Sequence, residues 1–172
     1  QLDPAQFSQH HEGLILLTGC RRSPLSTLAV EGRLDEAMRL LKNYRDCFGR
    51  NDVFVELQQN LVHGDTARNR RLAALAHEAD VGGVATNNVH YHVRDRRRLN
   101  DALVAIKSNS TLDQTHRERR PNSQFYMKSP GEMARLFRWC PEAISNTVRI
   151  AERCGFDLRQ DLGYTFPDHP VP

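Results

Sequence analysis

Short apolar runs alternate with segments of helical periodicity in the first half of the chain, and this alternation limits the fold more than any other feature. Runs 13–19, 53–57 and 83–86 have the length and the apolar or β-branched composition of buried strands. Residues 35–49 and 72–79 instead repeat apolar side chains at helical spacing. The order strand, helix, strand, helix, strand predicts an α/β fold with a parallel sheet and helices packed on it.

The pattern changes after residue 93, where only helices are expected. Asp95 is expected to cap a helix, and the polar residues 107–122 are expected to form a long loop, a candidate functional segment. Residues 129–132 have the pattern of a capping box, and Pro141 begins a further helix. The side chains expected to face inward from this last helix are Ile144, Val148 and Ala151.

These patterns divide the chain into three parts. Residues 1–93 are expected to hold the sheet and its helices, residues 94–165 a helical extension, and residues 166–172 an extended, proline-rich segment. A loop is expected to join the first strand to the helix at 35–49. Since the chain opens without Met, it is expected to be a piece of a longer protein.

The composition is that of one folded unit, because 172 residues of which 39% are hydrophobic and 26% charged can bury a single core. No apolar run approaches the ~20 residues of a membrane span, and the start lacks an export segment, so a cytoplasmic location is expected. The cysteines are scattered without a C-x-x-C pair, which argues against a zinc ribbon or a disulfide framework and predicts reduced thiols. They are Cys20, Cys47, Cys140 and Cys154.

Candidate functional residues stand at the carboxyl ends of the predicted strands. Cys20 follows the first strand, Glu56 ends the second, and Asn88 and His90 follow the third. Because parallel strands end at one edge of a sheet, these residues are expected to gather there, and on an extended backbone Asn88 and His90 would face one metal ion together. In the alternative interpretation, Cys20 is a small buried hydrophobe, Glu56 simply ends its strand and His90 is a hydrogen-bonded structural histidine.

Three basic runs, at 68–71, 94–98 and 117–120, are candidates for contact with phosphate groups. Acidic residues interleave with them, and the formal net charge of the chain is only +3. We therefore expect solvated helix faces rather than a DNA groove, with any DNA contact auxiliary.

Taken in order, five segments resemble the polymerase-and-histidinol-phosphatase (PHP) domain of the bacterial DNA polymerase III alpha subunit, particularly its error-prone form. The resemblance covers nearly the whole chain and implies part of a distorted (β/α)₇ barrel with a metal cluster at its C-terminal face. The matching segments are 13–20, 53–58, 85–91, 128–133 and 166–172.

The resemblance also implies roles for individual residues. Cys20 matches a metal-ligand position and His90 matches the His of the family's Asp-x-His pair, but Asn88 stands where the Asp is expected. A neutral amide is a weak ligand that cannot bridge two cations as a carboxylate does, so the site is expected to be impaired. The other ligands are expected upstream of residue 1. A divalent cation (zinc, manganese or magnesium) is implied, Glu56 is a candidate orienting residue, and His92 is expected to be surface structure.

The function implied by the resemblance is a structural or vestigially metal-binding part of an error-prone polymerase that serves replication and translesion repair. The rest of the polymerase chain, DNA bound through the parent protein, and replication or damage-tolerance factors are the implied partners. No catalytic residue is assigned to this chain. The alternatives are an active metal-dependent phosphoesterase or 3′-5′ exonuclease, a stand-alone phosphatase of the same superfamily, and a basic helical DNA-binding module.

Overall fold

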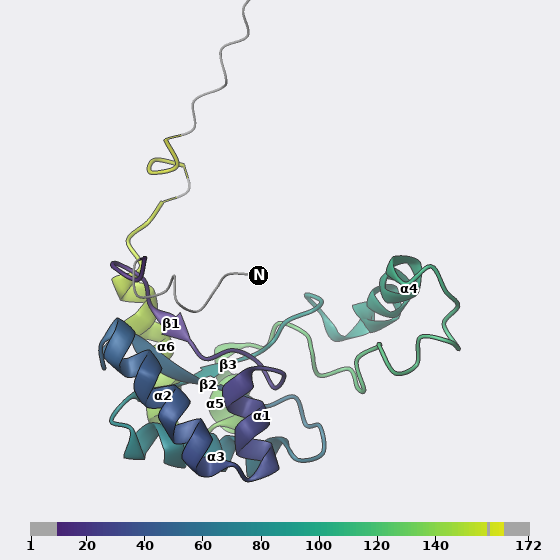
Figure 1. The fold of residues 1–172 in the computed structure, drawn as a ribbon. Helices are drawn as coiled ribbons and strands as arrows, with labels where there is room; N and C mark the ends of the chain where they lie inside the picture. The colour runs from purple at the N-terminus through teal and green to yellow at the C-terminus, as the bar shows by residue number, and fades with distance from the viewer. Residues whose placement is uncertain (1–9, 158, 164–172) are drawn as a thin grey trace, which may run out of the picture.

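A three-stranded parallel sheet lies at the centre of the computed structural model, which describes residues 10–157 and 159–163 (Figure 1). Its strands are β1 (Leu16–Leu17), β2 (Val53–Gln58) and β3 (Gly82–Thr86), in the order β1-β2-β3. The α/β fold with a parallel sheet is therefore confirmed. Three strands do not close a barrel, so a complete (β/α)₇ barrel is not shown by the described residues.

The first strand is much shorter than predicted. The run 13–19 was expected to form a buried strand, but only Leu16 and Leu17 pair with β2. Leu14 is 54% exposed and Leu17 38% exposed. The physical reason lies at the two ends of the run, where Gly13 and Gly19 have φ values of 75° and 86°, left-handed conformations that interrupt an extended strand.

A helix, α1 (Pro24–Glu31), follows β1 where only a loop was expected. Ser23 is its N-cap and accepts a hydrogen bond from the Ser26 amide at 3.3 Å. Gly32 ends the helix with a φ of 77°, a left-handed conformation that glycine adopts readily. The loop prediction was wrong because it overlooked this cap and the proline at the first helical position, which together indicate a helix start.

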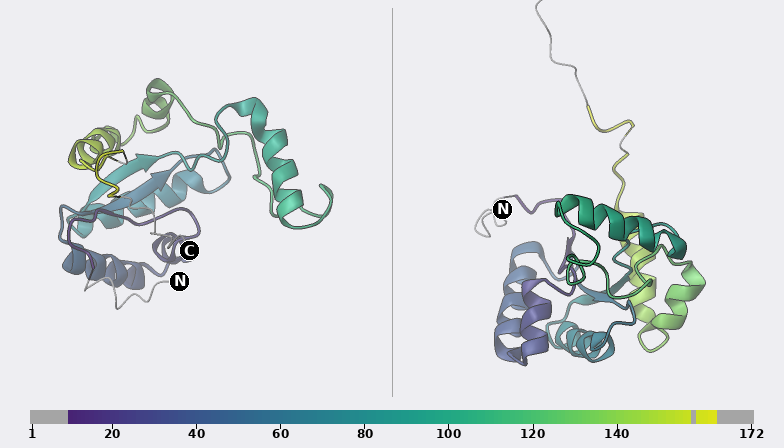
Figure 2. Two further views of the ribbon diagram at one scale, coloured as in Figure 1. Left: turned by 90° about the horizontal axis from the view of Figure 1, so that it is seen from above. Right: turned by 90° about the vertical axis from the view of Figure 1, so that its right-hand side faces the viewer.

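Two further helices of the first half agree with the prediction. They are α2 (Leu34–Phe48) and α3 (Asp65–Glu78), and Gly49 caps α2. In Figure 2, α1 and α2 lie together on one side of the sheet, and the C-terminal helices lie on the other side. Helix α3 lies beneath the sheet. The core joins one face of β2 to these helices, and its side chains include Ala37, Leu41, Val53, Val55, Leu57, Leu72 and Leu75.

The C-terminal helices are α5 (Pro130–Leu136) and α6 (Pro141–Arg153). The capping box is confirmed: Ser129 Oγ accepts from the Glu132 amide, and the Glu132 carboxylate accepts from the Ser129 amide at 2.9 Å. Val148 was expected to face inward, but it is 57% exposed. The prediction was wrong because α6 turns Ala143 and Asn146 inward instead, and Asn146 donates to the Gly83 carbonyl at 2.8 Å. Ala151 is exposed as well.

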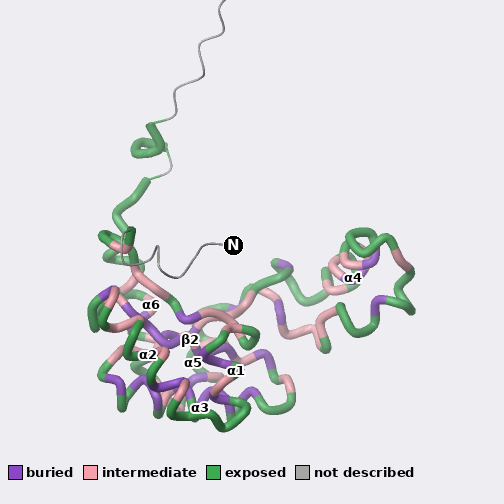
Figure 3. The backbone as a smooth tube through the Cα atoms, viewed as in Figure 1, coloured by how far each residue is buried: buried purple, intermediate pink, exposed green. Residues whose placement is uncertain are grey.

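Residues 94–122 project to one side of the body (Figure 1). They form a short 3₁₀ helix, η2 (Arg94–Arg96), then α4 (Arg97–Lys107), and beyond residue 107 a series of turns, as the loop prediction required. Arg96, not Asp95, is the N-cap of α4, because η2 displaces the helix start by one residue. Figure 3 shows how much of this projection is exposed. The apolar side chains of α4 that remain exposed are Leu99, Leu103 and Ile106.

In the described part of the chain, no helix is long and apolar enough to cross a membrane. The predicted extended segment 166–172 lies outside the described residues. The last strand, β3, ends at Thr86, and the predicted division into domains at residue 93 stays a prediction.

Candidate functional site

A polar cluster occupies the carboxyl end of β2 and β3. Glu56 Oε1 accepts hydrogen bonds from Gln58 Nε2 at 2.7 Å and from the Thr86 hydroxyl, and Gln58 Nε2 also lies 3.2 Å from Thr86 Oγ1. Thr18, just past β1, accepts from the Glu56 amide at 3.0 Å. Since Glu56 and Gln58 are two residues apart on one strand, they share a face of the sheet. The Glu56 carboxylate is thus bound to its sheet neighbours.

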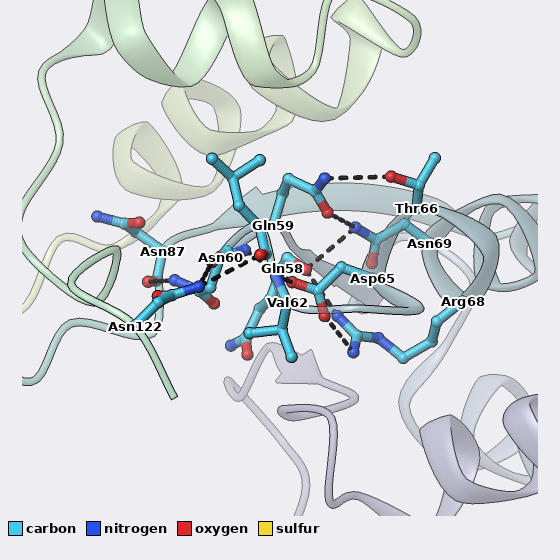
Figure 4. A network of polar contacts seen from close by, with 11 residues as sticks. Gln58, Gln59, Asn60, Val62, Asp65, Thr66, Arg68, Asn69, Asn87 and Asn122 are labelled. Atoms are coloured by element: carbon cyan, nitrogen blue, oxygen red, sulfur yellow. Dashed lines mark hydrogen bonds and ion pairs between the residues drawn. The ribbon is translucent and has the colours of Figure 1, made fainter. Parts of the chain in front are cut away.

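The loop between β2 and α3 is held by a buried ion pair (Figure 4). Asp65 and Arg68 lie 2.8 Å apart with side chains that are 2% and 5% exposed. Asp65 Oδ2 also accepts from the amides of Asn60 and Val62, at 2.9 and 3.1 Å. Arg68 Nη2 donates to the Gln58 carbonyl at 2.7 Å, so the end of β2 is fixed relative to α3.

A second set of bonds ties the chain after α4 back to the sheet edge. Asn122 Nδ2 donates to the Asn60 carbonyl at 2.8 Å, and Asn60 Nδ2 lies 3.2 Å from the Asn87 carbonyl. Asn87 itself donates to the Tyr126 carbonyl at 2.6 Å and accepts from Lys128 Nζ at 2.9 Å. These contacts, between residues 27 to 62 positions apart, place the segment that begins near residue 120 beside the ends of β2 and β3.

The predicted ligands lie at this edge but not as the sequence argument expected. Cys20 is half-buried in the turn after β1, where its carbonyl accepts from the Ser23 amide at 2.8 Å. Asn88 has a φ of 44° and so is not extended, which removes the reason for expecting Asn88 and His90 to face the same side. The left-handed conformation is one that asparagine tolerates better than most residues. His92 is exposed, in agreement with the prediction.

His90 is anchored through its backbone and packs on an aromatic ring. Its amide donates to the Phe125 carbonyl at 2.8 Å, and its imidazole meets the Phe125 ring edge-on, with 5.9 Å between centroids. Burial, and then the positive charge of Arg120, lower the pKa of His90 below 6.5. The imidazole is therefore held in its neutral form at pH 7, the form that a metal ion requires.

Arg120 interacts electrostatically with both predicted ligands, Cys20 and His90. Burial lowers its pKa, the charge of Arg22 lowers it further, and the thiol of Cys20 acts in the opposite direction. The geometry agrees with this: Arg120 and His90 both pack on the ring of Phe125, and Arg120 lines the same pocket as Arg22. Nothing in the sequence pattern indicated that residue 120 would reach the turn after β1.

The donor atoms of this chain do not complete a metal site. Over the residues that the structure describes, no three His, Cys, Asp or Glu side chains are grouped so that they could hold a metal ion. Cys20 and His90 offer one sulfur and one nitrogen, and Asn88 adds at most a neutral oxygen. Since a zinc ion takes at least three protein ligands, the described residues alone do not fit a zinc site of the kind that the resemblance implies.

Two of the three basic runs differ from the prediction of solvated helix faces. Arg68 is buried in its ion pair, and Arg71 Nη1 donates to the Ala29 carbonyl at 3.1 Å, so the first run is structural. Residues 117–120 are in turns and not in a helix. Only the run at 94–98, on η2 and the first turn of α4, is largely exposed on helical backbone.

Comparison with known proteins shows which protein family the chain resembles. Residues 1–60, which include β1, α1, α2 and β2, match the PHP domain family. The chain is also similar to polymerases over most of its length. It is 38% identical over 172 residues to the error-prone DNA polymerase of Symbiobacterium thermophilum, covering 96% of this chain and 16% of that protein.

Two further relatives are a DNA polymerase III alpha subunit and a second error-prone DNA polymerase. The DNA polymerase III subunit alpha of Deinococcus radiodurans is 34% identical over 177 residues, with 100% of this chain and 13% of that protein covered. The error-prone DNA polymerase of Mycolicibacterium paratuberculosis is 38% identical over 143 residues, with 83% and 13% covered. The resemblance to the PHP domain of DNA polymerase III alpha and error-prone polymerases is thus confirmed. The chain spans 13–16% of the length of these relatives.

Proposed function

We propose that this chain is a structural part of the PHP domain of an error-prone polymerase of the DNA polymerase III alpha type, with an impaired metal site. The observation that carries this proposal is the combination of Asn88 at the expected Asp position with a sheet edge that lacks a third ligand among the described residues. A site without a bridging carboxylate holds two cations poorly.

The surroundings of Glu56 and Asn87 support a structural role. Glu56 is bound to Gln58 and Thr86, and the side chain of Asn87 links the 126–128 segment to β3. The hydrogen bonds of these polar side chains therefore stabilise the fold. In this proposal Cys20 and His90 are a minority of the ligands, and any zinc, manganese or magnesium ion would need donors from outside the described residues.

The wider context is part of the same proposal. The chain covers a small share of its relatives, which are DNA polymerases by name, so the rest of a polymerase chain is its nearest partner. DNA replication and translesion repair, contact with DNA through the parent protein, and replication or damage-tolerance factors follow from that assignment. The division at residues 93 and 165 and a cytoplasmic location remain predictions from the sequence.

The first test is the size of the native protein in its source cells, measured with an antibody raised against this chain. A band several times larger than 19.7 kDa supports the polymerase assignment. A band only modestly larger contradicts it and favours a stand-alone phosphatase of the same superfamily.

The second test concerns the impaired site in the full-length protein. We expect little bound metal and no phosphoesterase or exonuclease activity, and we expect Asn88→Asp to increase metal content. His92→Ala is a matched control for His90→Ala, because both histidines are exposed and two residues apart. Activity in the unaltered protein that is lost in His90→Ala and kept in His92→Ala would establish the active alternative instead.

A further inference from the structure

A basic pocket lies between the turn after β1 and the chain that returns from α4. Its volume is about 590 Å³, and it opens beside the edge that carries Cys20. Its walls come from separate parts of the sequence, namely the β1–α1 turn, Val62 before α3, the start of α4, residues 116–121 and Phe125. The arginines that line it are Arg21, Arg22, Arg97, Arg117, Arg119 and Arg120.

The positive charge of this pocket is poorly compensated. Glu118 is its one acidic lining residue, and its carboxylate accepts a hydrogen bond from the Ser108 hydroxyl. Behind the wall, buried Asp101 lies 3.8 Å from Arg97 Nε and 3.6 Å from Arg119 Nη1. Six guanidinium groups and two carboxylates leave a local excess of positive charge. This excess is larger than the net charge of +3 carried by the whole chain.

Several guanidinium groups are available to a ligand. Within residues 10–157 and 159–163, the remaining four arginines of the pocket form no ion pair with a carboxylate. Nε of Arg97 and Nε of Arg119 are buried without a hydrogen-bond partner in the same part of the chain. Both of these guanidinium groups lie against Asp101, so the arginines open to a ligand are the other four.

Arg120 is oriented before any ligand arrives. Its guanidinium carbon lies 5.6 Å from the centroid of the buried Phe125 ring, and its carbonyl accepts from Arg97 Nη2 at 3.4 Å. Such a stacked guanidinium loses less side-chain freedom on binding than an extended one does. The pocket therefore combines an ordered arginine with exposed ones, Arg21, Arg22 and Arg117.

We infer that this pocket binds phosphate groups through its arginines. Guanidinium groups match phosphate oxygens in pairs, and a concentration of them raises the local density of anions. The phosphate comes either from the backbone of single-stranded DNA or from a free polyphosphate. Phe125 carries the one benzene ring of the lining, and this ring is buried. The pocket therefore offers no exposed benzene ring on which a base could stack, and it recognises negative charge instead.

The test uses the full-length protein that contains this chain and an arginine-specific reagent, phenylglyoxal. Modification of Arg22 and Arg120 is mapped by mass spectrometry with no ligand, with single-stranded oligothymidylate and with pyrophosphate. We expect several-fold slower modification at both arginines with at least one of the two ligands, and no change at the exposed Arg39 and Arg138, which lie outside the pocket.

The two ligand arms identify the source of the phosphate. Protection by oligothymidylate assigns the pocket to a DNA backbone, and protection by pyrophosphate alone assigns it to a free polyphosphate. Modification rates that stay the same with both ligands overturn the inference. This readout needs no substitution, so a variant that fails to fold cannot obscure it.

A charge-matched pair of variants then tests the DNA arm. The double variant Arg22→Gln, Arg120→Gln is compared with Arg39→Gln, Arg138→Gln for oligothymidylate binding over a range of salt concentrations. We expect the slope of log affinity against log salt to become shallower by about two in the first variant, about one for each phosphate contact removed. The second variant keeps the slope of the unaltered protein. Equal slopes in both variants contradict a DNA backbone in this pocket.

Discussion

The guanidinium of Arg68 and the carboxylate of Asp65 lie 2.8 Å apart in the first turn of α3, both almost completely buried. The pair joins the end of β2 to α3, because Arg68 also donates to the Gln58 carbonyl. Arg50 and Asp80 form a second pair of the same length, 2.8 Å, but their side chains are 65% and 67% exposed. The two pairs therefore differ in burial and not in length.

This contrast predicts different costs for the same substitution. Arg68→Gln leaves a buried carboxylate without its cation, and we expect the free energy of unfolding to fall by roughly 3–5 kcal/mol. Arg50→Gln should change it by no more than about 1 kcal/mol, because an exposed pair is screened by water. Urea denaturation of both variants gives the comparison, and equal losses would contradict the role assigned to the buried pair.

Two neighbouring glycines of β3 are predicted to respond differently to alanine. A Cβ at Gly82 would lie 2.7 and 2.8 Å from two carbons of the Phe54 ring, whereas one at Gly83 would meet its first neighbour, Leu57 Cδ1, at 3.6 Å. We expect Gly82→Ala to destabilise the fold by about 1–3 kcal/mol through overpacking. Gly83→Ala is the matched control and should be neutral or slightly stabilising. Thermal unfolding measures both, and similar midpoints would show that Phe54 moves aside freely.

The capping box of α5 predicts a pH dependence. Hydrogen bonds from the Tyr126 hydroxyl, and then from the Ser129 amide and hydroxyl, lower the pKa of Glu132 from 4.5 to about 2. A lowered acid pKa means stability that is present above pH 4.5 and is lost as the pH falls towards 2. The stability difference between the unaltered chain and Glu132→Gln should therefore be constant near neutral pH and shrink below pH 4.5.

Denaturation midpoints at a series of pH values test this dependence. Glu152→Gln is a suitable control, because Glu152 is exposed and forms no hydrogen bond or ion pair within the described residues. A difference for Glu132→Gln that stays constant down to pH 2 would rule out the proposed contribution of the capping box.

The position of Arg120 predicts a change in the titration of His90. Burial is the larger cause of the lowered pKa of His90 and the charge of Arg120 is the second. Arg120→Gln should raise this pKa towards 6.5 without restoring it fully, because burial remains. Arg117→Gln, which removes a charge that does not act on His90, should leave it unchanged. The imidazole resonances in NMR spectra report the pKa, and equal values in all three proteins would place Arg120 away from His90.

Local patterns were sufficient for the elements whose signals lie within a few residues. The strands at 53–57 and 83–86, the helix that ends at Gly49 and the capping box at Ser129 are each specified by periodicity or by a cap, and each appears in the structure. Even α1 had such a signal in Ser23 and Pro24. The run at 13–19 shows the limit, since its composition is that of a buried strand but only Leu16 and Leu17 pair with β2.

The parallel α/β arrangement, the relationship to PHP-containing polymerases and the presence of Asn88 in place of an acid could all be read from the amino-acid sequence. The left-handed conformation of Asn88, the bond between Glu56 and Thr86, and the packing of Arg120 and His90 on one Phe125 ring could not. The difference is one of range along the chain. Periodicity and capping act between neighbours in sequence, whereas the basic pocket joins residues about 100 positions apart, and such contacts depend on how the whole chain folds back on itself.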